Sequence, residues 1–153
     1  TKLFPDLTYH KGKKPWHIPA DVAMPCATEN EIDEKDCVAL IKHGVKIVAE
    51  GANMPTTPKA IALLREAKVA YAPGKAANAG GVAVSSLEMT QNNLGYSWPR
   101  DEIDEKLQVI MRNIHEQCVQ FGYSEQDKRT NYARGANIAG FKKVADAMLA
   151  LGI

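Results

Sequence analysis

The chain has 153 residues, of which 45% are hydrophobic, and a formal net charge of +1 at neutral pH. A chain of this length fits one ordinary domain and is long enough to bury a core of its own. Acidic and basic residues are interleaved along the chain. No charged patch therefore points to nucleic acid or to an anionic membrane surface as a partner.

The sequence also lacks the features of membrane-spanning, secreted, disulfide-linked and metal-binding proteins. No apolar stretch approaches the ~18 residues that a membrane span requires, and no secretory leader pattern opens the chain, so we expect a cytoplasmic protein. The three cysteines, Cys26, Cys37 and Cys118, are odd in number and widely spaced. This pattern disfavours disulfides and thiolate metal sites, and it predicts buried free thiols. The four histidines are scattered, so we expect no metal site.

The first part of the chain alternates short apolar runs with helical patterns. After an extended piece and a loop over residues 1–17, apolar runs predict strands over Ile18 to Met24, Val45 to Ala49 and Val69 to Ala72. Strands joined by helices through short links are typical of a parallel sheet wrapped by helices, so we expect an α/β fold.

The first of these helices has recognisable end signals. It extends over Asp33 to Lys42, and Gly44 stands where a helix commonly stops. Thr28 and Asn30 are residue types that cap helix starts, and Glu31 follows Thr28 by three residues as in a capping box.

Later helices make up the rest of the chain. One is capped by Thr57, begins at Pro58 and runs through Ala67. A long helix follows Gly81, and Trp98-Pro99 separates it from the next helix. That next helix carries an apolar face from Ile103 to Phe121. We expect a polar loop over Gly122 to Asn131 and a final helix from about Asn137.

The segment from Ala72 to Met89 combines a Pro-Gly pair, two adjacent glycines and a spaced set of three residues. Asn78, Val82 and Ser85 recur at i, i+4 and i+7 and would share one helical face. Such a face, beside the free N–H groups of a helix start, suits a polar or anionic small molecule. A glycine-rich helix start packed against a strand explains the spacing equally well.

Small and polar residues follow each predicted strand. These segments are Cys26-Ala27-Thr28, Gly51-Ala52-Asn53 and Gly74 to Asn78. Ligands of open parallel sheets bind beyond the carboxyl ends of the strands, so these residues could form part of a nucleotide crevice. The structural alternative stays open, because Thr28 could merely cap a helix and Asn53 could merely hold a turn.

Several common motifs are missing from the sequence. No G-x-G-x-x-G fingerprint occurs among the glycines, and Gly74-Lys75 lacks the remainder of a P-loop. No serine lies in a G-x-S-x-G motif, so triad chemistry has no support.

Four motifs together closely resemble the hexameric glutamate dehydrogenases, in order, spacing and C-terminal ending. They are Pro25 to Glu31 (PCATENE), Ala49 to Thr57 (AEGANMPTT), Ala72 to Met89 (APGKAANAGGVAVSSLEM) and Gly135 to Phe141 (GANIAGF). The resemblance runs through essentially the whole chain and points to the C-terminal third of such an enzyme. The bacterial NADP-linked type is nearest.

The resemblance implies a function and a set of site residues. The family interconverts L-glutamate with 2-oxoglutarate and ammonia, with NADP as the implied cofactor and NAD not excluded. Ala27 and Thr28 would line the cofactor crevice, and Asn53 and Asn78 would lie near the nicotinamide and its ribose. Val82 and Ser85 would line the substrate pocket. Within that pocket, the Ser85 hydroxyl would bond the side-chain carboxylate of glutamate.

Ser85 also distinguishes branches of the superfamily that the resemblance covers. The related leucine, phenylalanine and valine dehydrogenases share the Asn-Ala-Gly-Gly-Val element but look apolar where Ser85 stands. A hydroxyl bonded to a substrate carboxylate is costly to leave unpaired, so such a site rejects aliphatic side chains.

The resemblance implies that the chain is incomplete as an enzyme. It lacks the substrate domain with the catalytic lysine and aspartate, and Lys75 does not replace that lysine. We expect residues 1–100 to form the C-terminal half of a Rossmann-like dinucleotide-binding domain and residues 101–153 to form a helical segment packing back on it. The chain alone should be inactive.

Two expectations about assembly follow. The parent enzyme would be a homo-hexamer, whereas the isolated chain could form non-native oligomers through its unpaired sheet edge. A second reading, a stand-alone non-catalytic module for ligand sensing or subunit interaction, stays open.

Overall fold

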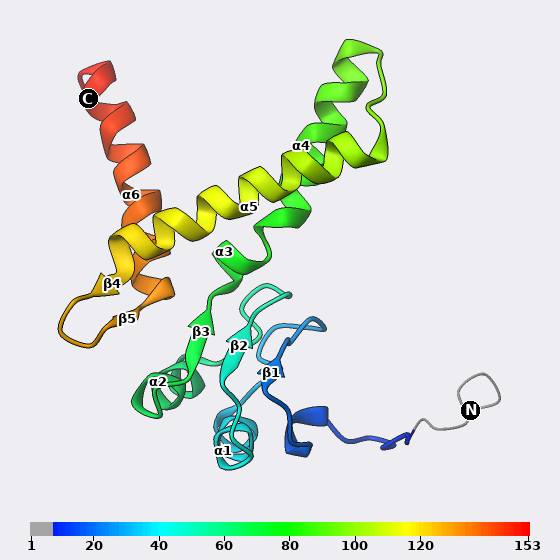
Figure 1. Ribbon diagram of the computed structural model, residues 1–153, viewed down its shortest axis with the longest axis vertical. Helices are drawn as coiled ribbons and strands as arrows, with labels where there is room; N and C mark the ends of the chain where they lie inside the picture. The colour runs from blue at the N-terminus through cyan, green and yellow to red at the C-terminus, as the bar shows by residue number, and fades with distance from the viewer. Residues whose placement is uncertain (1–7) are drawn as a thin grey trace.

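The computed structural model describes residues 8–153 and contains a three-stranded parallel sheet (Figure 1). Its strands are β1 (Val22–Ala23), β2 (Ile47–Ala49) and β3 (Ala70–Ala72), hydrogen-bonded in the order β1-β2-β3. In register, Val48 lies between Ala23 and Tyr71. The expected α/β fold with a parallel sheet is confirmed.

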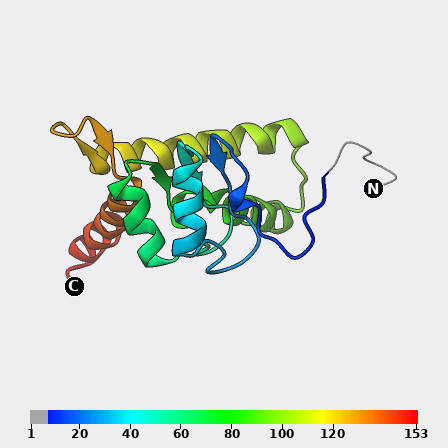
Figure 2. The same ribbon diagram turned by 90° about the horizontal axis from the view of Figure 1, so that it is seen from below.

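Helices α1 (Glu34–Lys42) and α2 (Pro58–Glu66) connect successive strands. Because both crossovers run in the same direction across the sheet, right-handed connections place both helices on the same face. Figure 2 shows them side by side. The principal core lies between them and the sheet. Its buried members are Trp16, Ala23, Ile32, Cys37, Leu40, Val45, Val48, Ala60, Leu64 and Tyr71.

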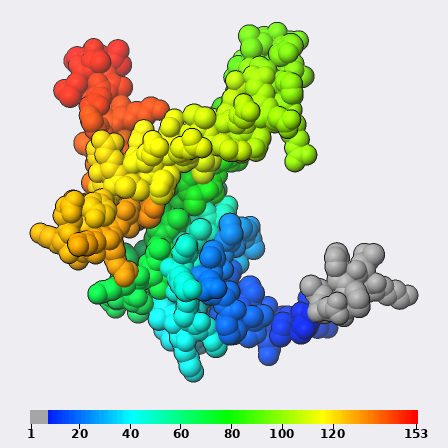
Figure 3. Space-filling view, in the orientation of Figure 1, coloured from blue at the N-terminus to red at the C-terminus, as the bar shows by residue number. Residues whose placement is uncertain are grey.

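The remaining elements lie beyond β3. They are α3 (Gly74–Ala77), α4 (Ala79–Leu94), α5 (Arg100–Gly122), the hairpin of β4 (Tyr123–Ser124) with β5 (Arg129–Thr130), and α6 (Tyr132–Leu151); a short 3-10 helix, η1 (Pro15–His17), precedes β1. The long helix α5 crosses the molecule, and α4 and α6 pack against it. In the space-filling view, the ends of α4 and α6 project as two separate arms (Figure 3).

The contact between α5 and α6 depends on a glycine. A Cβ added at Gly135 would overlap the backbone carbonyl of Cys118, so only glycine lets the two helices approach this closely. Gly135 is the one buried residue of α6 within the described chain. Gly135 therefore fixes the beginning of α6 against α5, and the later residues of α6 are exposed or only half-buried.

The cap of α1 differs from the sequence prediction. Asp33, rather than Thr28 or Asn30, caps the helix: its carboxylate accepts hydrogen bonds from the backbone N–H groups of Lys35 and Asp36 at 2.9 and 3.0 Å. Glu31 instead accepts from the N–H groups of Ala27 and Thr28. Asp33 is the better cap because it lies directly at the helix start and completes its own capping box with Asp36.

Other helix ends follow the sequence signals. Thr57 caps α2 by accepting a hydrogen bond from the Ala60 N–H at 3.3 Å, and Pro58 occupies the first turn. Gly44 follows α1 with a φ of +80°, in the left-handed region that glycine adopts without strain.

Three further predictions differ from the structure. The first strand is shorter than Ile18 to Met24, because Pro19 has no N–H to give to a ladder and Val22 is exposed at the sheet edge. The polar loop over residues 122–131 contains the β4–β5 hairpin. The final helix begins at Tyr132 rather than near Asn137, since the Asn131 side chain caps it by accepting from the Arg134 N–H.

Candidate functional site

The carboxyl ends of β1 and β2 border an open depression of about 390 Å³. Three of the predicted cofactor residues, Ala27, Thr28 and Asn53, line it together with Cys26, Glu29, Gly51 and Ala52. Small side chains form most of this wall, so a flat or bulky group can approach the backbone. The Thr28 hydroxyl, the Asn53 carboxamide and the Glu29 carboxylate are the polar groups of its lining.

The fourth predicted cofactor residue, Asn78, joins this group through its side chain. Its Nδ2 donates to the Asn53 Oδ1 at 2.7 Å and to the Ala52 carbonyl at 3.1 Å. Residues that follow β2 and β3, about 25 positions apart in sequence, are therefore fixed against each other. Because the Asn78 amide donates to Asn53, the Asn53 Nδ2 remains available as a donor at the rim of the depression.

The helix that was expected after Gly81 starts earlier, because α4 begins at Ala79 with Asn78 as its N-cap. Helix α3 begins earlier, at Gly74, so the Asn78 N–H is engaged by the Gly74 carbonyl at 2.9 Å and the Gly81 N–H by the Asn78 carbonyl at 3.2 Å. The N–H groups of Asn78 and Gly81 are therefore bonded within the chain, and these two are not the free donors that a helix start was expected to offer. Asn78 contributes through its carboxamide instead.

The two predicted substrate residues lie farther along α4 and are open to solvent. Val82 is 68% exposed. The Ser85 side chain is exposed, and its hydroxyl donates to the Gly81 carbonyl one turn earlier at 3.2 Å. Neither residue lines the depression that contains Asn53. The described residues therefore supply only one side of any pocket around Ser85.

A residue that sequence reasoning missed holds the strand-end loops together. Glu50 is only 3% exposed, and its carboxylate accepts from the Thr56 N–H at 3.3 Å and from the Gly74 N–H at 2.6 Å. Burial raises the pKa of the neighbouring Tyr71 phenol far above its ordinary range, and the Glu50 carboxylate raises it further. The available signal was strand periodicity, since Glu50 lies in phase with buried Val48.

Lys75 also has a defined partner. Its ammonium group donates to the Asn137 Oδ1 at 2.6 Å. The contact joins the Ala72 to Met89 motif to the Gly135 to Phe141 motif across α3 and α6. Lys75 therefore links, by a side-chain hydrogen bond, two of the segments that resemble the family.

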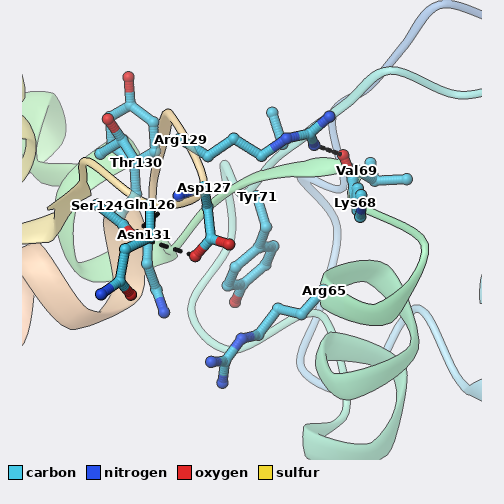
Figure 4. A pocket seen from close by; sticks show the side chains of 12 residues that line it. Arg65, Lys68, Val69, Tyr71, Ser124, Gln126, Asp127, Arg129, Thr130 and Asn131 are labelled. Carbon is cyan, nitrogen blue, oxygen red and sulfur yellow. Dashed lines mark hydrogen bonds between the residues drawn. The ribbon is translucent and has the colours of Figure 1, made fainter.

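A second cavity, of about 670 Å³, lies elsewhere (Figure 4). It is found at the amino end of β3, between the end of α2 and the β4–β5 hairpin, and Arg65, Lys68, Arg129 and Asp127 line it. Arg129 closes one side by donating to the Lys68 carbonyl. Ligands of parallel sheets bind at the opposite, carboxyl end of the strands, and this cavity contains none of the predicted site residues.

Potential metal-ligating side chains and thiols are dispersed within residues 8–153. Within residues 8–153, no group of three or more His, Cys, Asp or Glu side chains is placed to hold a metal ion. In the same range, no helix is long and apolar enough to cross a membrane. All three cysteines are free, and Cys37 and Cys118 are buried as expected. Cys26 is exposed, which corrects the prediction for this residue: it follows an edge strand at the open depression.

Comparison with known proteins gives consistent results. Two relatives are the NADP-specific glutamate dehydrogenase of Salmonella typhimurium, 58% identical over 96% of this chain, and the NAD-specific glutamate dehydrogenase of Bacteroides fragilis, 55% identical over 98%. The chain spans 32% and 34% of their respective lengths. The crystal structure of Plasmodium falciparum glutamate dehydrogenase superimposes with a TM-score of 0.90 and 45% identity, over 95% of this chain and 31% of that one.

The family profile itself covers nearly the whole chain. The profile described as glutamate/leucine/phenylalanine/valine dehydrogenase matches residues 2–152. Together with the parallel sheet and the polar residues gathered at its carboxyl edge, this match shows that the chain belongs to the glutamate/leucine/phenylalanine/valine dehydrogenase family.

Proposed function

We propose that this chain is the part of a glutamate dehydrogenase that forms one wall of the dinucleotide crevice. The whole enzyme would oxidise L-glutamate to 2-oxoglutarate and ammonia with NADP, NAD not being excluded. The observation that carries the proposal is the Asn53–Asn78 carboxamide pair beside the Ala27–Thr28 depression. The relatives named above support the choice of substrate and cofactor.

The side chains around the depression fit such a cofactor. Ala27 leaves room for a ring, while the Thr28 hydroxyl and the Asn53 carboxamide offer donors and acceptors for a ribose or a carboxamide. The bound cofactor would supply the hydride acceptor. Asn78 would orient Asn53 through the 2.7 Å hydrogen bond, so that the nicotinamide is held in one position.

Substrate recognition is assigned to α4. Val82 would contact the carbon chain of glutamate, and the Ser85 hydroxyl would bond its side-chain carboxylate. The exposure of both residues is consistent with a pocket completed by another part of the enzyme. The catalytic lysine and aspartate belong to that other part, so the 153-residue chain alone is expected to be inactive.

The remaining assignments concern organisation. Residues 1–100 would be the C-terminal half of the dinucleotide-binding domain, and residues 101–153 would pack back on it and on the substrate domain. The enzyme would be a cytoplasmic homo-hexamer.

Substitution of Ser85 tests the proposed function in the complete gene product that carries these residues. Ser85→Ala removes a hydrogen bond to a charged group and should lower kcat/KM for glutamate roughly 10- to 100-fold. Discrimination against aliphatic amino acids should weaken as well. Steady-state kinetics with glutamate, leucine and norvaline measure both effects.

The chain offers a matched control for this substitution. Ser86 is the next residue of α4, is exposed, and makes the same kind of backbone contact, to the Val82 carbonyl at 3.0 Å. Ser86→Ala should leave the glutamate preference unchanged. Equal effects of the two substitutions, or unaltered specificity in Ser85→Ala, would count against the assignment.

A further inference from the structure

We propose that Glu50 is the positioning residue of the Asn53–Asn78 pair: its carboxylate fixes the loop that carries Asn53 against the helix start that leads to Asn78. The effect of Glu50 on catalysis rests on the proposed function, whereas its effect on the arrangement of Asn53 and Asn78 does not.

Glu50 is an unusual residue to find buried. It is 3% exposed, and no ion pair within residues 8–153 involves it. Buried carboxylates are usually paired with cations or saturated with hydrogen bonds, because desolvation of the charge is costly. Here backbone N–H groups take the place of a cation, and hydrogen bonds to an ionised acceptor are the strong ones.

Those N–H groups belong to the two segments that carry the carboxamides. Oε1 accepts from Thr56, at the end of the loop that contains Asn53, and Oε2 accepts from Gly74, the first residue of α3. The Glu50 side chain therefore connects the segment that follows β2 with the segment that follows β3. The direct Asn78–Asn53 hydrogen bond connects the same two segments.

Gly74 shows how tightly these groups converge. A Cβ added there would lie 2.8 Å from the Ala52 carbonyl, 3.3 Å from Glu50 Oε2 and 3.5 Å from Asn78 Nδ2. The Ala52 carbonyl is itself an acceptor for Asn78. A carboxylate, a carbonyl and a carboxamide thus meet around one glycine, and displacement of any of them shifts the others.

Glu50→Gln is the sharpest substitution because it preserves shape. A carboxamide has one oxygen and one NH2 group, so it cannot accept from both N–H groups at once. One of the two segments must be released. Glu34→Gln makes the same chemical change at a partly exposed residue of α1 and serves as the control. Within residues 8–153, the ion pair of Glu34 is to Lys59 at 3.5 Å.

The geometric arm of the test uses the isotope-labelled 153-residue chain. The side-chain amide resonances of Asn53 and Asn78, assigned by their loss in Asn53→Asp and Asn78→Asp, should shift in Glu50→Gln, and the Asn78 amide protons should exchange faster with solvent. Glu34→Gln should move neither. Unmoved amide resonances in a folded Glu50→Gln chain would overturn the proposal. If Glu50→Gln does not fold, Glu50→Asp, which keeps the charge but shortens the side chain, carries the same test.

The kinetic arm uses the complete gene product. Glu50→Gln should raise the KM for the dinucleotide and lower kcat, with kcat/KM falling on the order of tenfold or more, while the KM for glutamate stays near its wild-type value. Glu50→Asp should recover part of the loss. A parallel rise in both KM values with no recovery would contradict a positioning role. An inactive wild-type gene product would refute the proposed function and leave the amide test of Glu50 intact.

Discussion

At the residue scale, the carboxyl edge of the sheet is organised by hydrogen bonds among uncharged groups and one carboxylate. Asn78 donates to Asn53 and to the Ala52 carbonyl, and Glu50 accepts from two backbone N–H groups. Directional bonds of this kind fix orientation more than they add stability, because each replaces a hydrogen bond to water. Orientation is what a dinucleotide site requires.

Asn78→Asp should destabilise the chain through this edge. The substitution replaces a donor by an ionised oxygen that faces the Ala52 carbonyl and the Asn53 Oδ1, so two acceptors lose their partner. Urea denaturation should report a loss of about 1–3 kcal/mol in the free energy of unfolding. Asn113→Asp, at an exposed position within α5, should change it by less than about 0.5 kcal/mol. Equal losses of unfolding free energy in the two variants would argue against a stabilising role of the Asn78 hydrogen bonds.

Part of the carboxyl edge of the sheet could be predicted from the sequence. The three strand ends were identified from their apolar runs, and the convergence of Ala27, Thr28 and Asn53 in one depression followed from parallel topology. The Asn78–Asn53 bond was not predictable, because side-chain hydrogen bonds depend on the path of each loop. Glu50 was overlooked because charged residues are almost never fully buried, and only the phase of β2 indicates its direction.

At the scale of elements, helix ends followed the local chemistry of the nearest capping side chain. Thr57-Pro58 and Gly44 were predictable because each acts within its own turn. Asp33 and Asn131 cap α1 and α6 from the position directly before the first helical residue. Apolar periodicity, by contrast, identifies a helix only once a full turn of apolar residues has been reached. The start of α6 was further obscured by Gly135, which is required by packing against α5 rather than by a turn.

The α1–α2 pair predicts a dependence of stability on alkaline pH. Cys37 on α1 donates to the Ala60 carbonyl of α2, and burial raises the pKa of its thiol from about 9 to about 11. Between these values the unfolded chain ionises while the folded chain keeps its proton. Stability should therefore fall as pH rises above about 9, by about 1.4 kcal/mol per pH unit for this group.

Urea denaturation at a series of alkaline pH values measures this slope. Cys37→Ala should make the slope shallower without abolishing it, because burial also raises the pKa values of Cys118, Tyr71 and Tyr132. The cavity lowers stability at every pH. Cys26→Ala should retain the wild-type slope, because Cys26 is exposed. A slope that is the same in Cys37→Ala and wild type would show that another group is responsible.

At the scale of the whole molecule, apolar surface is unevenly distributed. The core between the sheet and helices α1 and α2 is closed, whereas the α6 arm exposes Phe141, Val144 and Leu149 at 73%, 59% and 77%. Contiguous exposed apolar surface marks an interface or an association hazard. A helix packed only at its beginning on α5 cannot bury these side chains within the described chain.

The isolated chain should therefore self-associate. Light scattering over a range of concentrations should show an average mass above that of the monomer. Phe141→Lys combined with Leu149→Lys should lower it, since a charged α6 face no longer gains from burial. Asn113→Lys adds charge on the exposed face of α5 and should have little effect. A monomer at every concentration would contradict this prediction.

We propose that this chain supplies a cofactor wall, with the proton-transfer groups on another part of the enzyme. The most direct measurement compares glutamate-dependent reduction of NADP and of NAD by the complete gene product and by the 153-residue chain under the same conditions. Turnover is expected from the gene product and not from the chain alone. Turnover by the chain alone, or no glutamate oxidation by the gene product with either cofactor, would contradict it.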